Sequence, residues 1–147
     1  MRYCMDTIGP LPFAQDDRLM LLQITAFVQG GYASGGASAM GESTFSEDTL
    51  ADPLRGAQGQ EVMAHEIIHQ WWGLGRVFDD FDMAGQNAPE WSSEGLTTYT
   101  TYRMMKEKYG EAYADEHYVQ VWQREADTYA RDFYTRHPEY LDRRPED

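Results

Sequence analysis

The sequence has one cysteine, few basic residues and no long apolar run, and each shortage excludes a class of protein. Cys4 is the only cysteine among 147 residues, so neither an intrachain disulfide nor a thiolate zinc cluster can form. Lysine and arginine number 12 against 25 acidic residues, which gives a net charge of −13. Because phosphate binding requires a basic face, this charge argues against a nucleic-acid partner and against docking on an anionic membrane.

The chain also lacks any stretch of 18 apolar residues, so we expect none of it to cross a membrane. No apolar run follows Met1-Arg2-Tyr3, so we expect no signal peptide; such a segment in a longer parent protein would lie outside these residues. The apolar fraction of 41% and the aromatic fraction of 14% are those of a chain that folds. The length predicts a single domain, residues 1–147.

Local patterns predict an α+β fold that is mostly helical. Leu19 to Val28 is apolar and partly β-branched, which predicts a strand. Residues 30–41 contain five glycines, which is typical of a flexible loop or an irregular strand. A short edge strand is expected at Glu42 to Phe45, a loop at residues 76–87, and helices at about 60–72, 88–108 and 111–136. In the last helix the spacing of the aromatic residues predicts a core-facing stripe of Tyr118, Trp122, Tyr129 and Phe133.

The first of these helices carries the pattern H-E-x-x-H, from His65 to His69. Residues four apart share one helix face, so both imidazoles can reach one cation. Glu66 then points near the same cavity, where it can accept a proton from water. The alternative is a pair of histidines hydrogen-bonded in an ordinary core, but such a helix would bury polar groups at a cost that nothing offsets.

A catalytic zinc site needs a third protein ligand and an open position. The metzincin pattern requires Gly at position 72 and His at position 75, and Trp72 and Gly75 exclude it. The two other histidines, His117 and His137, lie in polar surroundings that indicate the surface. A carboxylate is the remaining choice, and Glu90 and Glu94 compete for the role because they lie one helical turn apart.

At these residues the sequence resembles the gluzincin zinc aminopeptidases, the aminopeptidase N family. His65 to Gly73, HEIIHQWWG, is similar to the family's H-E-x-x-H-Q-W-F-G, and Trp91 to Gly95, WSSEG, to its W-L-N-E-G. The glutamate of the second motif is the family's third zinc ligand, so the resemblance favours Glu94. It implies Zn2+ as cofactor and a thermolysin-like catalytic core with a small N-terminal β-sheet. The resemblance covers about residues 36–110. The same motifs also resemble those of peptidase domains that are fused to bacterial transporter-like membrane proteins.

A further segment, Ala39-Met40-Gly41-Glu42-Ser43, is similar to the family's G-A-M-E-N exopeptidase motif. The glutamate of that motif contacts the free amino terminus of the substrate, and Glu42 precedes His65 by 23 residues. The resemblance therefore assigns substrate binding to Glu42. The alternative is a loop glutamate in solvent.

The sequence departs from the family pattern in three places. There are 24 residues between His69 and Glu94, more than is usual in the family, and Leu74 stands where the family has asparagine. The family's tyrosine that stabilises the tetrahedral intermediate would fall beyond Asp147, and Tyr134 and Tyr140 are the nearest candidates. We therefore expect a fragment or a minimal version of a longer catalytic domain, which need not be active alone.

The expected function is zinc-dependent hydrolysis of peptide bonds at peptide N-termini. His65, His69 and Glu94 would bind the metal, Glu66 would be the catalytic residue, and Glu42 would hold the amino group of a peptide substrate. Two alternatives stay open. One is a zinc endopeptidase with the same core, and the other is a zinc-bearing interaction module without catalysis.

Overall fold

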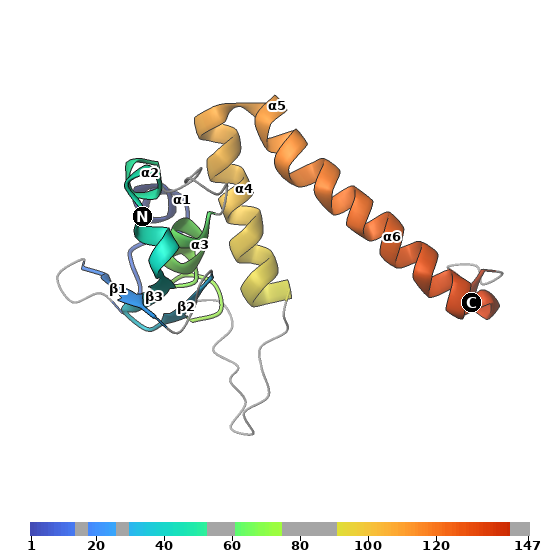
Figure 1. Ribbon diagram of the computed structural model, residues 1–147, viewed down its shortest axis with the longest axis horizontal. Helices are drawn as coiled ribbons and strands as arrows, with labels where there is room; N and C mark the ends of the chain where they lie inside the picture. Colours follow the sequence, from blue (N-terminus) through green and yellow to red (C-terminus); the bar gives the residue numbers. More distant parts are fainter. Residues whose placement is uncertain (14–17, 26–29, 53–60, 75–90, 142–147) are drawn as a thin grey trace, which may run out of the picture. The chain divides into compact units, whose positions relative to one another are not determined.

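The computed structural model describes residues 1–13, 18–25, 30–52, 61–74 and 91–141 (Figure 1). The chain divides into two compact units, Met1–Met104 and Met105–Asp147. The elements are mostly helical, with one sheet of three strands in the first unit. The single domain expected from the length stays a prediction, and so does the thermolysin-like core.

The sheet of the first unit consists of β1 (Met20–Ile24), β2 (Gly31–Ser34) and β3 (Ala37–Gly41), in the order β1-β3-β2. The β1 and β3 strands are parallel, whereas β2 and β3 form an antiparallel hairpin. The strand predicted at Leu19 to Val28 is confirmed over its described part. Of the two alternatives for the glycine-rich segment, loop or strand, the structure has strands: this hairpin, which turns at Gly36 with a φ of +79°.

A further prediction about this region is wrong. Glu42 to Phe45 forms a 3-10 helix instead of an edge strand, and α2 (Glu47–Ala51) follows directly. The reason lies in Ser46, which caps α2 by accepting a hydrogen bond from the Thr49 main-chain N–H. Such a side-chain cap gives the chain a local alternative to strand pairing.

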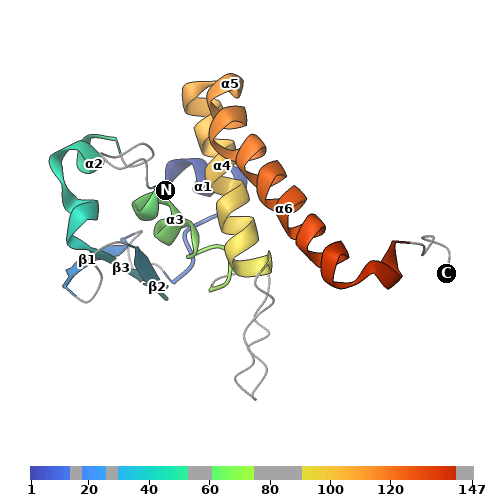
Figure 2. The ribbon, with the colours of Figure 1, turned by 45° about the vertical axis from the view of Figure 1, so that its right-hand side comes forward.

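The metal-motif helix is α3 (Val62–Ile68), and it is shorter than predicted because residues 69–74 form turns. It lies against the β2–β3 hairpin (Figure 2). Gly73, with a φ of +85°, lies in these turns, four residues past the helix C-cap His69. The second predicted helix is a π-helical turn, Trp91–Gly95, continued by α4 (Leu96–Tyr109). The predicted loop at residues 76–87 and Glu90 lie outside the described residues.

An N-terminal helix that the sequence patterns did not predict, α1 (Arg2–Thr7), supplies part of the core behind the metal-motif helix. Trp71 is fully buried, and its indole N–H donates to the carbonyl oxygen of Gly9 at 2.9 Å. Burial raises the pKa of the Cys4 thiol to about 11, so this cysteine packs as an apolar side chain. The buried members of this cluster are Cys4, Leu11, Ile68 and Trp71.

The second unit contains the end of α4, then α5 (Glu111–Ala114), a π-helical turn (Asp115–Val119) and α6 (Gln120–Arg136). The helix predicted at residues 111–136 is confirmed, and Pro138 begins a short 3-10 turn after it. The predicted core stripe is wrong for α6, which has no buried residue. Helical spacing shows which side chains share a face, but not whether another element covers that face.

His117 and His137 lie on the surface, as their polar surroundings indicated. Each contacts a nearby group: the Tyr113 carbonyl at 2.9 Å and the Glu139 carboxylate at 3.2 Å, respectively. Over the described part of the chain, no helix is long and apolar enough to cross a membrane.

Candidate metal centre

Three predicted ligands meet at one point in the first unit. The Nε2 atoms of His65 and His69 are 3.0 Å apart, and both approach the carboxylate of Glu94. Its Oε2 lies 3.0 Å from the His65 nitrogen, and its Oε1 lies 3.4 Å from the His69 nitrogen. The histidines come from the end of α3, and the glutamate comes from the turn before α4, so the structure brings two distant segments together.

These separations fit a small cation. Zinc bonds of 2.0–2.1 Å in tetrahedral geometry place neighbouring ligand atoms about 3.3 Å apart. The observed separations run from 3.0 to 3.4 Å. Two imidazole nitrogens and one carboxylate also match the donor set of a catalytic zinc site with one open position. The three residues present therefore fit the ion that the sequence implied.

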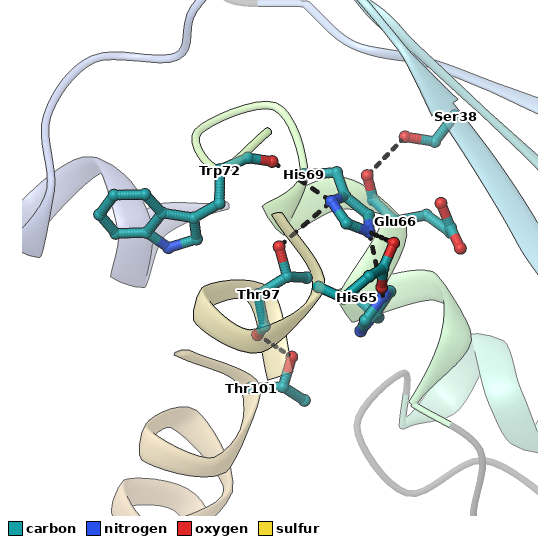
Figure 3. A network of polar contacts seen from close by, with 8 residues as sticks. Ser38, His65, Glu66, His69, Trp72, Thr97 and Thr101 are labelled. Atoms are coloured by element: carbon teal, nitrogen blue, oxygen red, sulfur yellow. Dashed lines mark hydrogen bonds and ion pairs between the residues drawn. The ribbon is translucent and has the colours of Figure 1, made fainter. Parts of the chain in front are cut away.

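The tautomer of His69 follows from its second ring nitrogen. Nδ1 lies 3.2 Å from the carbonyl oxygen of Trp72 and 3.2 Å from the hydroxyl oxygen of Thr97 (Figure 3). Because a carbonyl only accepts, the ring proton is assigned to Nδ1. The Nε2 atom then keeps its lone pair and points it at the other two ligands, as a metal ligand must.

Sequence reasoning missed Thr97. Thr97 is fully buried, and its hydroxyl contacts the His69 ring. A signal was present: Thr97 follows Glu94 by three residues, and residues three apart share a helix face. Thr98 lies on a different part of that helix.

Burial, more than any neighbouring charge, keeps His65 neutral. Burial and the neighbouring His69 lower its pKa, and the nearby carboxylate of Glu94 opposes that change only in part. A lowered pKa means that the imidazole is unprotonated near neutral pH, so its Nε2 can donate electrons to a cation.

Glu66 occupies a buried position beside the ligands. The residue is only 7% exposed. Burial, together with the charge of Glu94, raises the pKa of its carboxyl group to about 7 in the protein chain alone. Its main-chain carbonyl accepts a hydrogen bond of 3.0 Å from the hydroxyl of Ser38 (Figure 3). A carboxylate that titrates near neutrality suits proton transfer, because it can both take up and release a proton.

The turn after α3 packs closely against the segment that carries Glu94. A Cβ at Gly73 would lie 2.3 Å from the Oγ of Ser93, so only glycine allows this approach. The indole N–H of Trp72 donates to the hydroxyl of Thr100 at 2.8 Å and makes a second link.

The remaining predicted residue, Glu42, begins the 3-10 helix after β3 and is exposed. Within the described residues it is not a member of the ligand group. Its role in substrate binding stays a prediction. Tyr134 and Tyr140, the candidates for the missing tyrosine, both belong to the second unit.

Comparison with known proteins links the chain to peptidases. It is 26% identical over 105 residues to "Probable aminopeptidase 1" of Sulfurisphaera tokodaii and 24% identical over 105 residues to the protein of the same name from Saccharolobus solfataricus. Each match covers 69% of this chain but 12% of the relative, so the chain spans about an eighth of the length of these curated relatives. No family model and no solved structure matches.

The Thr97 contact predicts an effect on metal affinity. Replacing the hydroxyl in Thr97→Val removes one acceptor for the His69 Nδ1–H and leaves the Trp72 carbonyl in place. We expect the dissociation constant for Zn2+ to rise about tenfold, the lower end of such effects. Competition with a chromogenic chelator measures it, and Thr98→Val serves as the matched control. Equal zinc affinity of the Thr97 variant and the wild type would contradict the assignment.

The raised pKa of Glu66 predicts a pH dependence of stability in protein kept free of metal by a chelator. The carboxyl titrates at about 7 when folded and at 4.5 ordinarily, so folding binds a proton between these values. The stability that the neutral form contributes is complete below about pH 4.5 and is lost as the pH rises to about 7. Glu66→Gln stays neutral, so it should match the wild type at pH 4.5 and exceed it above pH 7 by up to about 3 kcal/mol.

Urea unfolding at pH 5 and pH 8 measures this difference between the two proteins. Other titrating groups, His65 included, are common to both and cancel to first order. A difference in the free energy of unfolding that is the same at both pH values would show that Glu66 has no raised pKa.

Proposed function

We propose that this chain is the catalytic core of a zinc-dependent aminopeptidase of the gluzincin type. The observation that carries the proposal is the meeting of two imidazole nitrogens and one carboxylate at 3.0–3.4 Å beside a buried glutamate. The names of the two relatives support the peptidase class, and the activity of a whole parent protein is part of the proposal.

In this proposal His65, His69 and Glu94 hold Zn2+. Bound there, the ion supplies a Lewis acid that polarises the scissile carbonyl and lowers the pKa of water. Glu66 takes a proton from water and later passes it to the leaving amine. The Trp72 carbonyl and the Thr97 hydroxyl keep the His69 ring in the tautomer that can bind the ion.

Glu66 is suited to this role by its surroundings. Burial disfavours its charged form and brings its pKa to about 7, so at neutral pH it exchanges a proton readily. The carboxylate of Glu94 is exposed and lies 3.0 Å from the His65 nitrogen, where it can serve as a ligand. The same fold therefore gives two neighbouring carboxylates different tasks, one as acid and base and one as ligand.

The second candidate is an endopeptidase with the same zinc site. It differs at the amino terminus of the substrate: an aminopeptidase needs a group that binds the ammonium there, for which Glu42 is the candidate, and an endopeptidase needs none. A zinc-bearing module without activity is the remaining alternative. It gives no reason for a buried glutamate beside the ligands.

Glu66→Gln should separate catalysis from metal binding. The amide cannot accept the proton, so we expect zinc content near one ion per chain and turnover reduced at least about a hundredfold. Metal analysis and aminoacyl fluorogenic substrates measure the two quantities, in this chain and in any longer parent. Glu47→Gln, an exposed change on α2, is the control. A zinc-loaded Glu66 variant with normal turnover would refute the assignment.

Glu42→Gln distinguishes the two peptidase candidates. If Glu42 binds the substrate ammonium, loss of its charge should raise KM for peptides with a free N-terminus about tenfold or more. Glu47→Gln again controls for loss of one acidic residue. Wild-type protein that cleaves N-blocked peptides internally, with a Glu42 variant of unchanged KM, would favour the endopeptidase.

A further inference from the structure

Gly31, in the β2 strand, lies directly against the side chain of Glu66. A Cβ atom at this glycine would be 2.5 Å from Cγ, 2.8 Å from Cδ and 2.9 Å from Oε1 of the glutamate. Nonbonded carbon atoms prefer separations of about 3.5–4.0 Å. Any side chain at position 31 would therefore push Glu66 away from where it now lies.

The backbone of Gly31 does not itself require glycine. Positive φ angles in the described chain occur at other glycines, among them Gly30 with +92° and Gly36 with +79°. Gly31 is in an extended strand that pairs with Met40, a conformation open to every residue with an L side chain. The three atoms nearest to a Cβ at this position all belong to the Glu66 side chain, so this contact and not the backbone conformation opposes a side chain there.

The strand cannot relieve such a clash by moving away, because the hairpin is tied to α3 by buried polar groups. Gln70 is fully buried, and its amide binds the hairpin turn. Its Oε1 accepts from the Gly36 N–H at 2.8 Å, and its Nε2 donates to the Ser34 carbonyl at 2.9 Å. Fully buried Ser38 adds the bond to the main chain of Glu66. Leaving such groups unpaired is costly, so the hairpin keeps its place.

We propose that Gly31 is a positioning residue for Glu66: its missing side chain lets the β2 backbone serve as the wall against which the carboxylate rests. The proposal rests on the proposed function for its catalytic consequence and deepens it. The β2 backbone limits where the carboxylate can go, and the buried hydrogen bonds of Gln70 and Ser38 hold that backbone in place. A proton acceptor that is displaced by about an ångström loses much of its effect, because proton transfer depends on distance.

The catalytic test is Gly31→Ala in the zinc-loaded chain or its longer parent. We expect kcat to fall at least tenfold, with KM changed less than twofold and the zinc content unchanged. Gly35→Ala is the matched control, because it makes the same substitution in the same hairpin and its Cβ meets the Phe13 side chain at 3.3 Å instead of Glu66. Normal kcat in Gly31→Ala would overturn the proposal, and so would equal losses of kcat in both variants.

A second test does not depend on activity. Gly31→Ala should lower the melting temperature by several degrees in the wild-type background, and by much less in Glu66→Ala, where Cγ and the carboxylate are gone. Equal losses in both backgrounds would show that the contact does not position Glu66 and would overturn the proposal. If the wild type hydrolyses no peptide but the two changes are coupled, the proposed function fails while Gly31 still positions Glu66.

Discussion

The structure of the first unit depends on holding His65, His69 and Glu94 within reach of one another. The two histidines are adjacent on one helix, but the glutamate follows the second one after 24 intervening residues. Loop closure over that distance costs entropy, which local contacts must offset. Three of them flank the ligands: Gly73 against Ser93, the Trp72 indole on Thr100, and Thr97 on the His69 ring. Each joins the end of α3 to the segment that begins α4.

The same arrangement buries several polar groups, and the shifted pKa values of two of them reflect the free-energy cost of burying a charge. Burial raises the pKa of Glu66 and lowers that of His65, so both are driven towards their neutral forms. In the chain alone this leaves two imidazole nitrogens facing each other at 3.0 Å. As neutral rings, one can donate its N–H to the other, and a cation between them would replace that hydrogen bond with two ligand bonds. The physical case for a metal therefore rests on electrostatics as well as on the distances.

The sequence predicted much of this site because its information was local. The spacing of His65 and His69 places them on one face of any helix, and the helix at residues 111–136 follows from an equally local pattern. The choice of Glu94 as the third ligand needed the family resemblance, because Glu90 fits the helical spacing equally well. Thr97 was missed although its spacing from Glu94 was a signal, and the role of the Trp72 carbonyl was missed because main-chain groups leave no signature in side-chain patterns. The prediction that the aromatic face of α6 is buried was wrong, because periodicity shows which side chains share a face but not whether another element packs against it.

The glycine-rich segment shows where composition stops being informative. Five glycines in residues 30–41 left a flexible loop and an irregular strand open, and the structure has a hairpin with fully buried Ser38 and Met40. Only some of these glycines serve the backbone: Gly36 turns the hairpin with a positive φ, whereas Gly31 is extended and leaves space for a neighbour. A glycine that makes room for one side chain 35 positions later in the chain cannot be told from a flexible one without the structure. Since the neighbour is Glu66, Gly31 is better explained by close packing against the proposed proton acceptor than by flexibility.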